Sequence, residues 1–66
     1  MQITINGTNK ELPAAIDLAH LVAQACKEPQ HVITEINGAI IPSSHWEKTL
    51  LKEGDVIELV TFVGGG

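Results

Sequence analysis

Two Asn-Gly dipeptides, each at the end of a β-branched run, are the feature that most constrains the fold. Asn6-Gly7 follows a run in which Ile3 and Ile5 alternate with polar residues, and Asn37-Gly38 ends the run HVITEIN. Both residues of such a dipeptide tolerate the positive φ angles that tight hairpin turns require. The sequence therefore predicts two β-hairpins, one at its start and one in its second half.

The return strand of each hairpin is short because a proline follows it. Lys10 to Leu12 can lie beside the first strand before Pro13, and Ala39 to Ile41 can lie beside the strand His31 to Asn37 before Pro42. Proline has no N–H to donate to a sheet ladder, so it stops a strand. Both returns are therefore expected to be brief.

A short helical segment is expected after the second hairpin. Ser43 or Ser44 precedes Glu47 in a serine-x-x-glutamate arrangement, which can cap a helical turn. Trp46 lies inside that turn, and we expect its side chain to close the edge of the core.

The residues between the two hairpins carry a helical pattern. Leu18, Leu21, Val22 and Ala25 recur at helical spacing and form one apolar stripe. Asp17 precedes them, and its carboxylate can accept hydrogen bonds from the amides of the first turn. We expect this helix to pack its stripe across one face of a sheet.

The longest strand-like run, VIELVTFV, covers Val56 to Val63. Ile57 and Leu59 share one face of this strand, whereas Val60 and Phe62 lie on the other. Both faces of this strand therefore carry large apolar side chains.

The element order is strand, strand, helix, strand, short strand, strand. One helix packed on one face of a mixed sheet buries all these stripes most simply. The order predicts an α+β fold of the β-grasp, ubiquitin-like type, with a mixed four- to five-stranded sheet. The first and last strands are expected to be adjacent and parallel at the sheet centre. We expect one domain over residues 1–63 and a flexible glycine tail over residues 64–66.

Size and charge exclude several classes of function. The chain has 66 residues, eight acidic residues, four lysines and no arginine. The acidic balance disfavours binding to nucleic acid or to an anionic membrane. A domain this small has little room for a catalytic pocket and its supporting residues, so an enzyme is not expected.

The single cysteine and the three histidines suggest no metal site. His20, His31, His45 and Cys26 follow none of the spacings that hold zinc. Cys26 is expected to be a small, buried or half-buried apolar group. Because no disulfide can form within the chain and no leader or membrane-length apolar run is visible, we expect a cytoplasmic protein.

Half of the six glycines are the last three residues, Gly64-Gly65-Gly66, directly after the final strand. Without side chains, such a tail can enter a narrow channel of another protein and present its carboxylate. A carboxylate is a poor electrophile at neutral pH and needs activation, for example by adenylation. A sulfur nucleophile could then convert it to a thiocarboxylate.

The segment EINGAIIPSSHWEKTLLKEGDVIELVTFVGGG, from Glu35 to Gly66, resembles the ThiS family, the sulfur carriers of thiamin biosynthesis. The likeness lies in Asn37-Gly38, Ile41-Pro42, Trp46, Glu53-Gly54-Asp55 and Phe62-Val63-Gly64-Gly65-Gly66. The resemblance implies that a ThiF-like adenylyltransferase activates Gly66 with ATP, and that a donor such as a cysteine desulfurase provides sulfur. The thiocarboxylate would then serve the thiazole synthase ThiG, with Gly64 and Gly65 entering the active sites of the partners. The carrier itself would bind no cofactor.

The resemblance also suggests a docking face beside the tail. Val60 and Phe62 would form an apolar patch, and Glu58 would steer an activating enzyme to it. A register slipped by one residue would instead place Phe62 in the core. Two other functions stay open: a carrier of the type found as the small subunit of molybdopterin synthase, and an interaction module whose glycines have no role.

Overall fold

The computed structural model describes residues 1–62. Its elements in chain order are β1 (Gln2–Ile5), β2 (Thr8–Glu11), α1 (Leu18–Ala25), the 3-10 helix η1 (Pro29–His31), β3 (Val32–Ile36), β4 (Ala39–Ile41), the 3-10 helix η2 (Ser43–Lys48) and β5 (Val56–Thr61). The predicted order of strands and helix is confirmed. The turn η1 was not predicted, and because it includes His31, β3 starts one residue later than expected.

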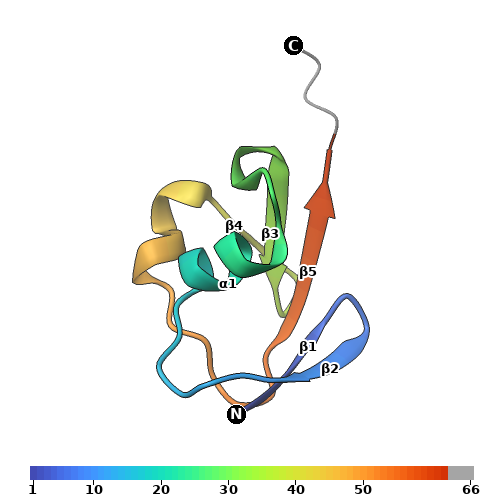
Figure 1. Ribbon diagram of the computed structural model, residues 1–66, viewed down its shortest axis with the longest axis vertical. Helices are drawn as coiled ribbons and strands as arrows, with labels where there is room; N and C mark the ends of the chain where they lie inside the picture. Colours follow the sequence, from blue (N-terminus) through green and yellow to red (C-terminus); the bar gives the residue numbers. More distant parts are fainter. Residues whose placement is uncertain (63–66) are drawn as a thin grey trace.

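The strands form one mixed sheet in the order β2-β1-β5-β3-β4 (Figure 1). β1 and β5 run parallel, whereas the pairs β1–β2, β3–β4 and β3–β5 are antiparallel. The first and last strands are therefore adjacent, and β5 lies at the sheet centre, as predicted. This is the expected α+β, β-grasp arrangement with five strands. The glycine tail, residues 64–66, and Val63 lie outside the described residues.

Both predicted Asn-Gly turns form, and each one is tied to β5. The φ angles are 49° at Asn6 and 52° at Asn37, and the following glycines are also positive. The Asn6 side-chain oxygen accepts from Leu59 N at 2.8 Å, and its Nδ2 donates to Leu59 O at 3.2 Å. Asn37 Oδ1 accepts from Val56 N at 3.0 Å. The hairpin turns thus fix the central strand from both sides.

The turn before β5 is fixed by a buried carboxylate. Asp55 is only 7% exposed. Its side chain accepts from Lys52 N at 2.8 Å and from Asn37 Nδ2 at 3.1 Å. A buried carboxylate is tolerated when hydrogen bonds satisfy it, so Asp55 joins the second hairpin to the start of β5.

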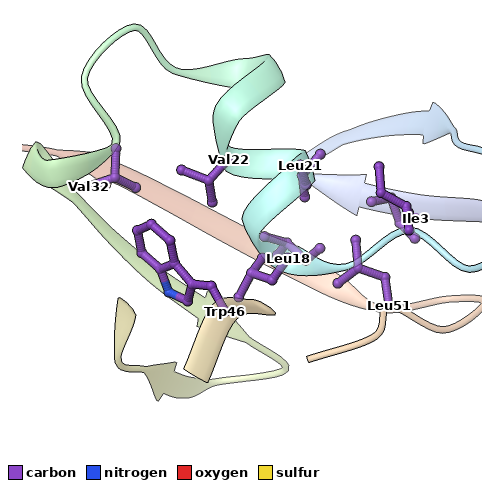
Figure 2. Packing of buried hydrophobic residues seen from close by; sticks show 9 residues of the cluster. Ile3, Leu18, Leu21, Val22, Val32, Trp46 and Leu51 are labelled. Atoms are coloured by element: carbon purple, nitrogen blue, oxygen red, sulfur yellow. The ribbon is translucent and has the colours of Figure 1, made fainter. Parts of the chain in front are cut away.

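The core lies between α1, η2 and one face of the sheet (Figure 2). Its buried apolar residues are Ile3, Ile16, Leu18, Leu21, Val22, Val32, Trp46, Leu51 and Ile57. Three of the four predicted helix positions are buried, but Ala25 is exposed. The helix ends at that residue, and the partly buried Cys26 packs against the core just beyond it.

The α-helix α1 and the 3-10 helix η2 begin differently. In α1 the Asp17 carboxylate accepts from His20 N at 2.8 Å, as predicted. This hydrogen bond, together with one to the His20 ring, holds the pKa of Asp17 below its usual value. In η2 the predicted serine cap is wrong, since no side chain caps the helix. Because η2 starts directly after Pro42, Ser43 and Ser44 lie inside its first turn instead of at the capping position.

Candidate functional site

The face of the sheet opposite α1 carries a row of exposed apolar side chains. Along β5 the inward positions Ile57 and Leu59 are buried or half-buried, whereas Val60 is 50% exposed. Phe62, two residues further along the same face, is 41% exposed. We call this surface the open face; its residues are Ile33, Glu35, Ile40, Val56, Glu58, Val60 and Phe62.

The end of the open face nearest the tail is apolar. Ile33 on β3 is the direct partner of Val60 on β5. Phe62 N donates to His31 O at 2.8 Å, and the rings of these two residues lie 5.7 Å apart at a tilted angle of 49°. Phe62 therefore belongs to the open face, which resolves whether it points to solvent or core.

Two carboxylates lie on the same face, further from the C-terminal end of β5. Glu35 and Glu58 are direct cross-strand partners of β3 and β5. Like charges in such positions repel each other and destabilise a sheet. The open face thus combines an apolar end with a negative charge pair, which suits a partner with apolar and basic side chains.

The sequence predicted docking contacts at Glu58, Val60 and Phe62, and the structure brings these residues onto this one face. Neighbouring strands add three residues that were not predicted: Ile33, Glu35 and Ile40. The period-two alternation of HVITEIN placed Ile33 and Glu35 on a common face, but could not assign that face to solvent. The predicted tail residues Gly64, Gly65 and Gly66 lie outside the described residues.

A shallow groove of about 210 Å³ lies where β4 ends and η2 begins. Val32, Thr34, Ile41, Pro42 and Trp46 are among its lining residues. The Trp46 ring nitrogen donates to Ile41 O at 2.9 Å, which holds the indole in place. Thr34 is fully buried, and within residues 1–62 its hydroxyl has no hydrogen-bond partner.

The remaining candidates form no reactive constellation. Cys26 is half-buried, as predicted. Within residues 1–62, no three His, Cys, Asp or Glu side chains gather in a way that could hold a metal ion. In the same part of the chain, no helix has the length and apolar character needed to cross a membrane.

The mixed five-stranded sheet, the single main helix and the central position of β5 define the chain as a β-grasp protein. Its candidate site is a sheet surface beside the end of β5, not an enclosed pocket. Within this class, a model of the ThiS family matches residues 3–66, and the chain belongs to that family. The resemblance noted in the sequence is confirmed.

Individual proteins of several organisms are similar to this chain. The crystal structure of a thiamine biosynthesis protein (ThiS) from Geobacter metallireducens aligns with a TM-score of 0.86 and 28% identity, over 100% of both chains. An uncharacterized protein of Trieres chinensis, ycf40, is 34% identical over 62 residues, which are 94% of this chain and 85% of that protein. A thiazole synthase of Paramagnetospirillum magneticum is 30% identical over 66 residues, which are 100% of this chain and 20% of that protein. The chain thus spans about a fifth of the length of that synthase.

Proposed function

We propose that this protein is a sulfur carrier of thiamin biosynthesis whose reactive group is the α-carboxylate of Gly66. Membership of the ThiS family and the likeness to a thiamine biosynthesis protein over the whole chain support this role. In this proposal the chain therefore presents sulfur, and its partners perform the chemistry.

The proposed activation has two steps. A ThiF-like adenylyltransferase joins the Gly66 carboxylate to the AMP part of ATP and releases pyrophosphate. In the second step the terminal sulfur of a persulfide, provided by a donor such as a cysteine desulfurase, displaces AMP and forms an acyl disulfide, and a thiol then reduces its S–S bond, which releases the thiocarboxylate and leaves a disulfide on the donor. The ATP is bound by the partner, so the carrier needs no cofactor of its own.

The proposed acceptor is the thiazole synthase ThiG. The similarity to a longer thiazole synthase supports a functional link between the two kinds of chain. Gly64 and Gly65 have no side chains, so they can follow Gly66 into a narrow active site. This property would serve the activating enzyme and the synthase alike.

The observation that carries the proposal is the position of the open face on β5, the strand that leads into the glycines. Val60 and Phe62 are half exposed at the end of that strand, where apolar contact with a partner would hold the tail in place. Glu58 lies on the same face and would attract a basic partner surface. These three residues are the proposed docking contacts.

Accurate intact mass and C-terminal peptide sequencing test the proposal. The protein is incubated with a ThiF-like enzyme, ATP and a sulfur source. Replacement of one oxygen by sulfur adds roughly 16 Da, which methionine or cysteine oxidation also adds, so the shift must be localised to Gly66. An ATP-dependent shift at Gly66 supports the carrier function. An unmodified terminus with a demonstrably active enzyme contradicts it.

Two altered tails provide matched controls. Deleting Gly65 and Gly66 should abolish modification and leave the fold intact, whereas an interaction module without a functional tail would keep its activity. Adding one alanine after Gly66 should abolish adenylation, because the carboxylate moves out of line with the reacting phosphate. Transfer of sulfur to a molybdopterin synthase partner, and not to ThiG, would favour the alternative carrier type.

A further inference from the structure

The central strand β5 extends beyond the strand on one of its sides. β1 pairs with β5 only at Thr4–Val56 and Ile5–Ile57. Beyond them, the Asn6 side chain takes the place of a further β1 residue: it donates to Leu59 O and accepts from Leu59 N. Figure 1 shows the β1–β2 hairpin staying at one end while β5 runs on beside β3. Within residues 1–62, the last part of β5 thus has a neighbouring strand on one side only.

The hydrogen-bond pattern shows which backbone groups face the vacant side. Asn6 N donates to Ile57 O, and Leu59 N donates to the Asn6 side chain, so the odd-numbered residues of β5 point toward β1. Phe62 N donates to His31 O, so the even-numbered residues point toward β3. Thr61 is also odd-numbered, so its N–H and C=O point to the same side of β5, where β1 has already ended.

Within residues 1–62, no backbone or side-chain group pairs with these two groups of Thr61. Its cross-strand neighbour Val32 donates its N–H to Pro29 O. Val32 and Thr61 are therefore a non-hydrogen-bonded pair of the β3–β5 ladder. A depression of about 360 Å³ lies beside Thr61 and is lined by Ala25, Cys26, Lys27 and Glu28. Thr61 thus offers a free backbone donor and acceptor, and its surroundings are not closely packed.

The distance to the reacting carboxylate indicates what fills this space. Residues 63–66 follow Phe62 and, at about 3.5 Å per residue, span at most roughly 14 Å. An enzyme that adenylates Gly66 must therefore place its active site within that distance of Phe62. Its surface must consequently come close to the free edge of β5.

We propose that an extended segment of the activating enzyme adds to the sheet at this edge and hydrogen-bonds the N–H and C=O of Thr61. The inference rests on the proposed function and adds a second mode of contact to it: main-chain pairing at the edge, besides side-chain contact on the open face. Strand addition fixes the direction of the strand it joins. Pairing at Thr61 would therefore aim the tail into the active site before the glycines are bound.

Two substitutions at one position test the pairing. Thr61→Pro removes the free N–H without removing a hydrogen bond of the β3–β5 ladder, whereas Thr61→Val keeps the N–H and the β-branched shape. We expect Thr61→Pro to raise the KM for the carrier roughly 3- to 10-fold in the adenylation assay, and Thr61→Val to leave it unchanged. Equal KM values for both variants and the unaltered protein would overturn the inference.

Amide hydrogen exchange of the unaltered protein provides a measurement that needs no substitution. The Thr61 amide should exchange rapidly in the free chain and at least tenfold more slowly with the enzyme bound, whereas the Phe62 amide should be protected in both states. Unchanged exchange at Thr61 would contradict the pairing even if Thr61→Pro proved to be misfolded. A concentration-dependent protection without enzyme would assign the edge to a second copy of the chain and overturn the proposed occupant.

The two proposals fail in different ways. If the unaltered protein is not adenylated at Gly66, the carrier function is wrong. If it is adenylated normally but Thr61 shows neither the KM effect nor the protection, only the strand pairing is wrong.

Discussion

The two faces of the sheet are formed by the same strands but have different surroundings. On the inner face, Ile3 and Ile57 are 1% and 0% exposed beneath α1. On the open face, Ile33, Val60 and Phe62 are between 41% and 50% exposed. Both faces are thus apolar, but only one is covered by the described part of the chain.

The difference shows that apolar content alone does not mark a core. Burial of apolar area stabilises the inner face, whereas the open face keeps exposed area that a partner could bury. The charges agree with this division, because Glu35 and Glu58 oppose each other on the open face at some cost to the free protein. We therefore expect substitutions on the inner face to affect folding and those on the open face to affect binding.

Ile57→Ala should have the largest effect on stability. The side chain is fully buried at the sheet centre, so its truncation leaves a cavity. We expect a loss of about 2–5 kcal/mol in the free energy of unfolding, measured by chemical denaturation. The matched truncation on the open face, Val60→Ala, should cost less than about 1 kcal/mol. Equal losses at both positions would contradict the division into two faces.

Phe62→Asp should separate binding from folding. Because Phe62 is largely outside the core, we expect the free energy of unfolding to change by less than about 1 kcal/mol. The affinity for the activating enzyme should fall by at least about tenfold, measured by calorimetry. Leu50→Asp, at an exposed position outside the sheet, is the control and should bind normally. Unfolding of the Phe62 variant would place this residue in the core and reject the docking face.

Thr34→Val should stabilise the protein. The hydroxyl of this fully buried residue has no partner within residues 1–62, and a buried, unpaired polar group costs free energy. Replacement by a methyl group of similar size should raise the free energy of unfolding by roughly 1 kcal/mol. Thr34→Ser keeps the hydroxyl and should not show this gain. A destabilised valine variant would indicate that the hydroxyl is hydrogen-bonded in solution.

Glu58→Gln should have the smallest effect on stability. It should stabilise the free protein slightly and slow its association with the activating enzyme. Removing the repulsion from Glu35 should stabilise the free protein by up to about 0.5 kcal/mol. Association with the activating enzyme should become slower at low salt, measured by stopped flow. Glu47→Gln, on η2, carries the same charge change away from the open face and should change neither. Faster association of the Glu58 variant would rule out electrostatic steering at this residue.

Much of the fold was predictable because its signals are local. The Asn-Gly turns, the Asp17 cap and the helical stripe are each determined by residues within a few positions of one another. The predictions that failed concern the ends of elements. Ser43 and Ser44 do not cap η2, and η1 replaces the first residue of the expected strand. Such ends depend on how the chain packs after each element, which a local pattern does not contain.

The candidate site was predicted only in part. Glu58, Val60 and Phe62 follow from the alternation along one strand, but Ile33, Glu35 and Ile40 join them only through the register between strands. The free edge at Thr61 was not predicted at all. It depends on where β1 ends relative to β5, and the two segments are far apart in the sequence.

The sequence by itself determined the element order, the two hairpins and the family resemblance, since turn residues, hydrophobic periodicity and motifs can be read along the chain. Only the tertiary structure decided which apolar face of β5 the helix covers. Both faces of VIELVTFV carry large side chains, and alternation separates two faces without saying which is buried. The choice depends on packing between distant residues, since Leu18 of α1 and Trp46 of η2 join one core with Ile57 of β5. Those contacts leave Val60 and Phe62 exposed at the end of the central strand.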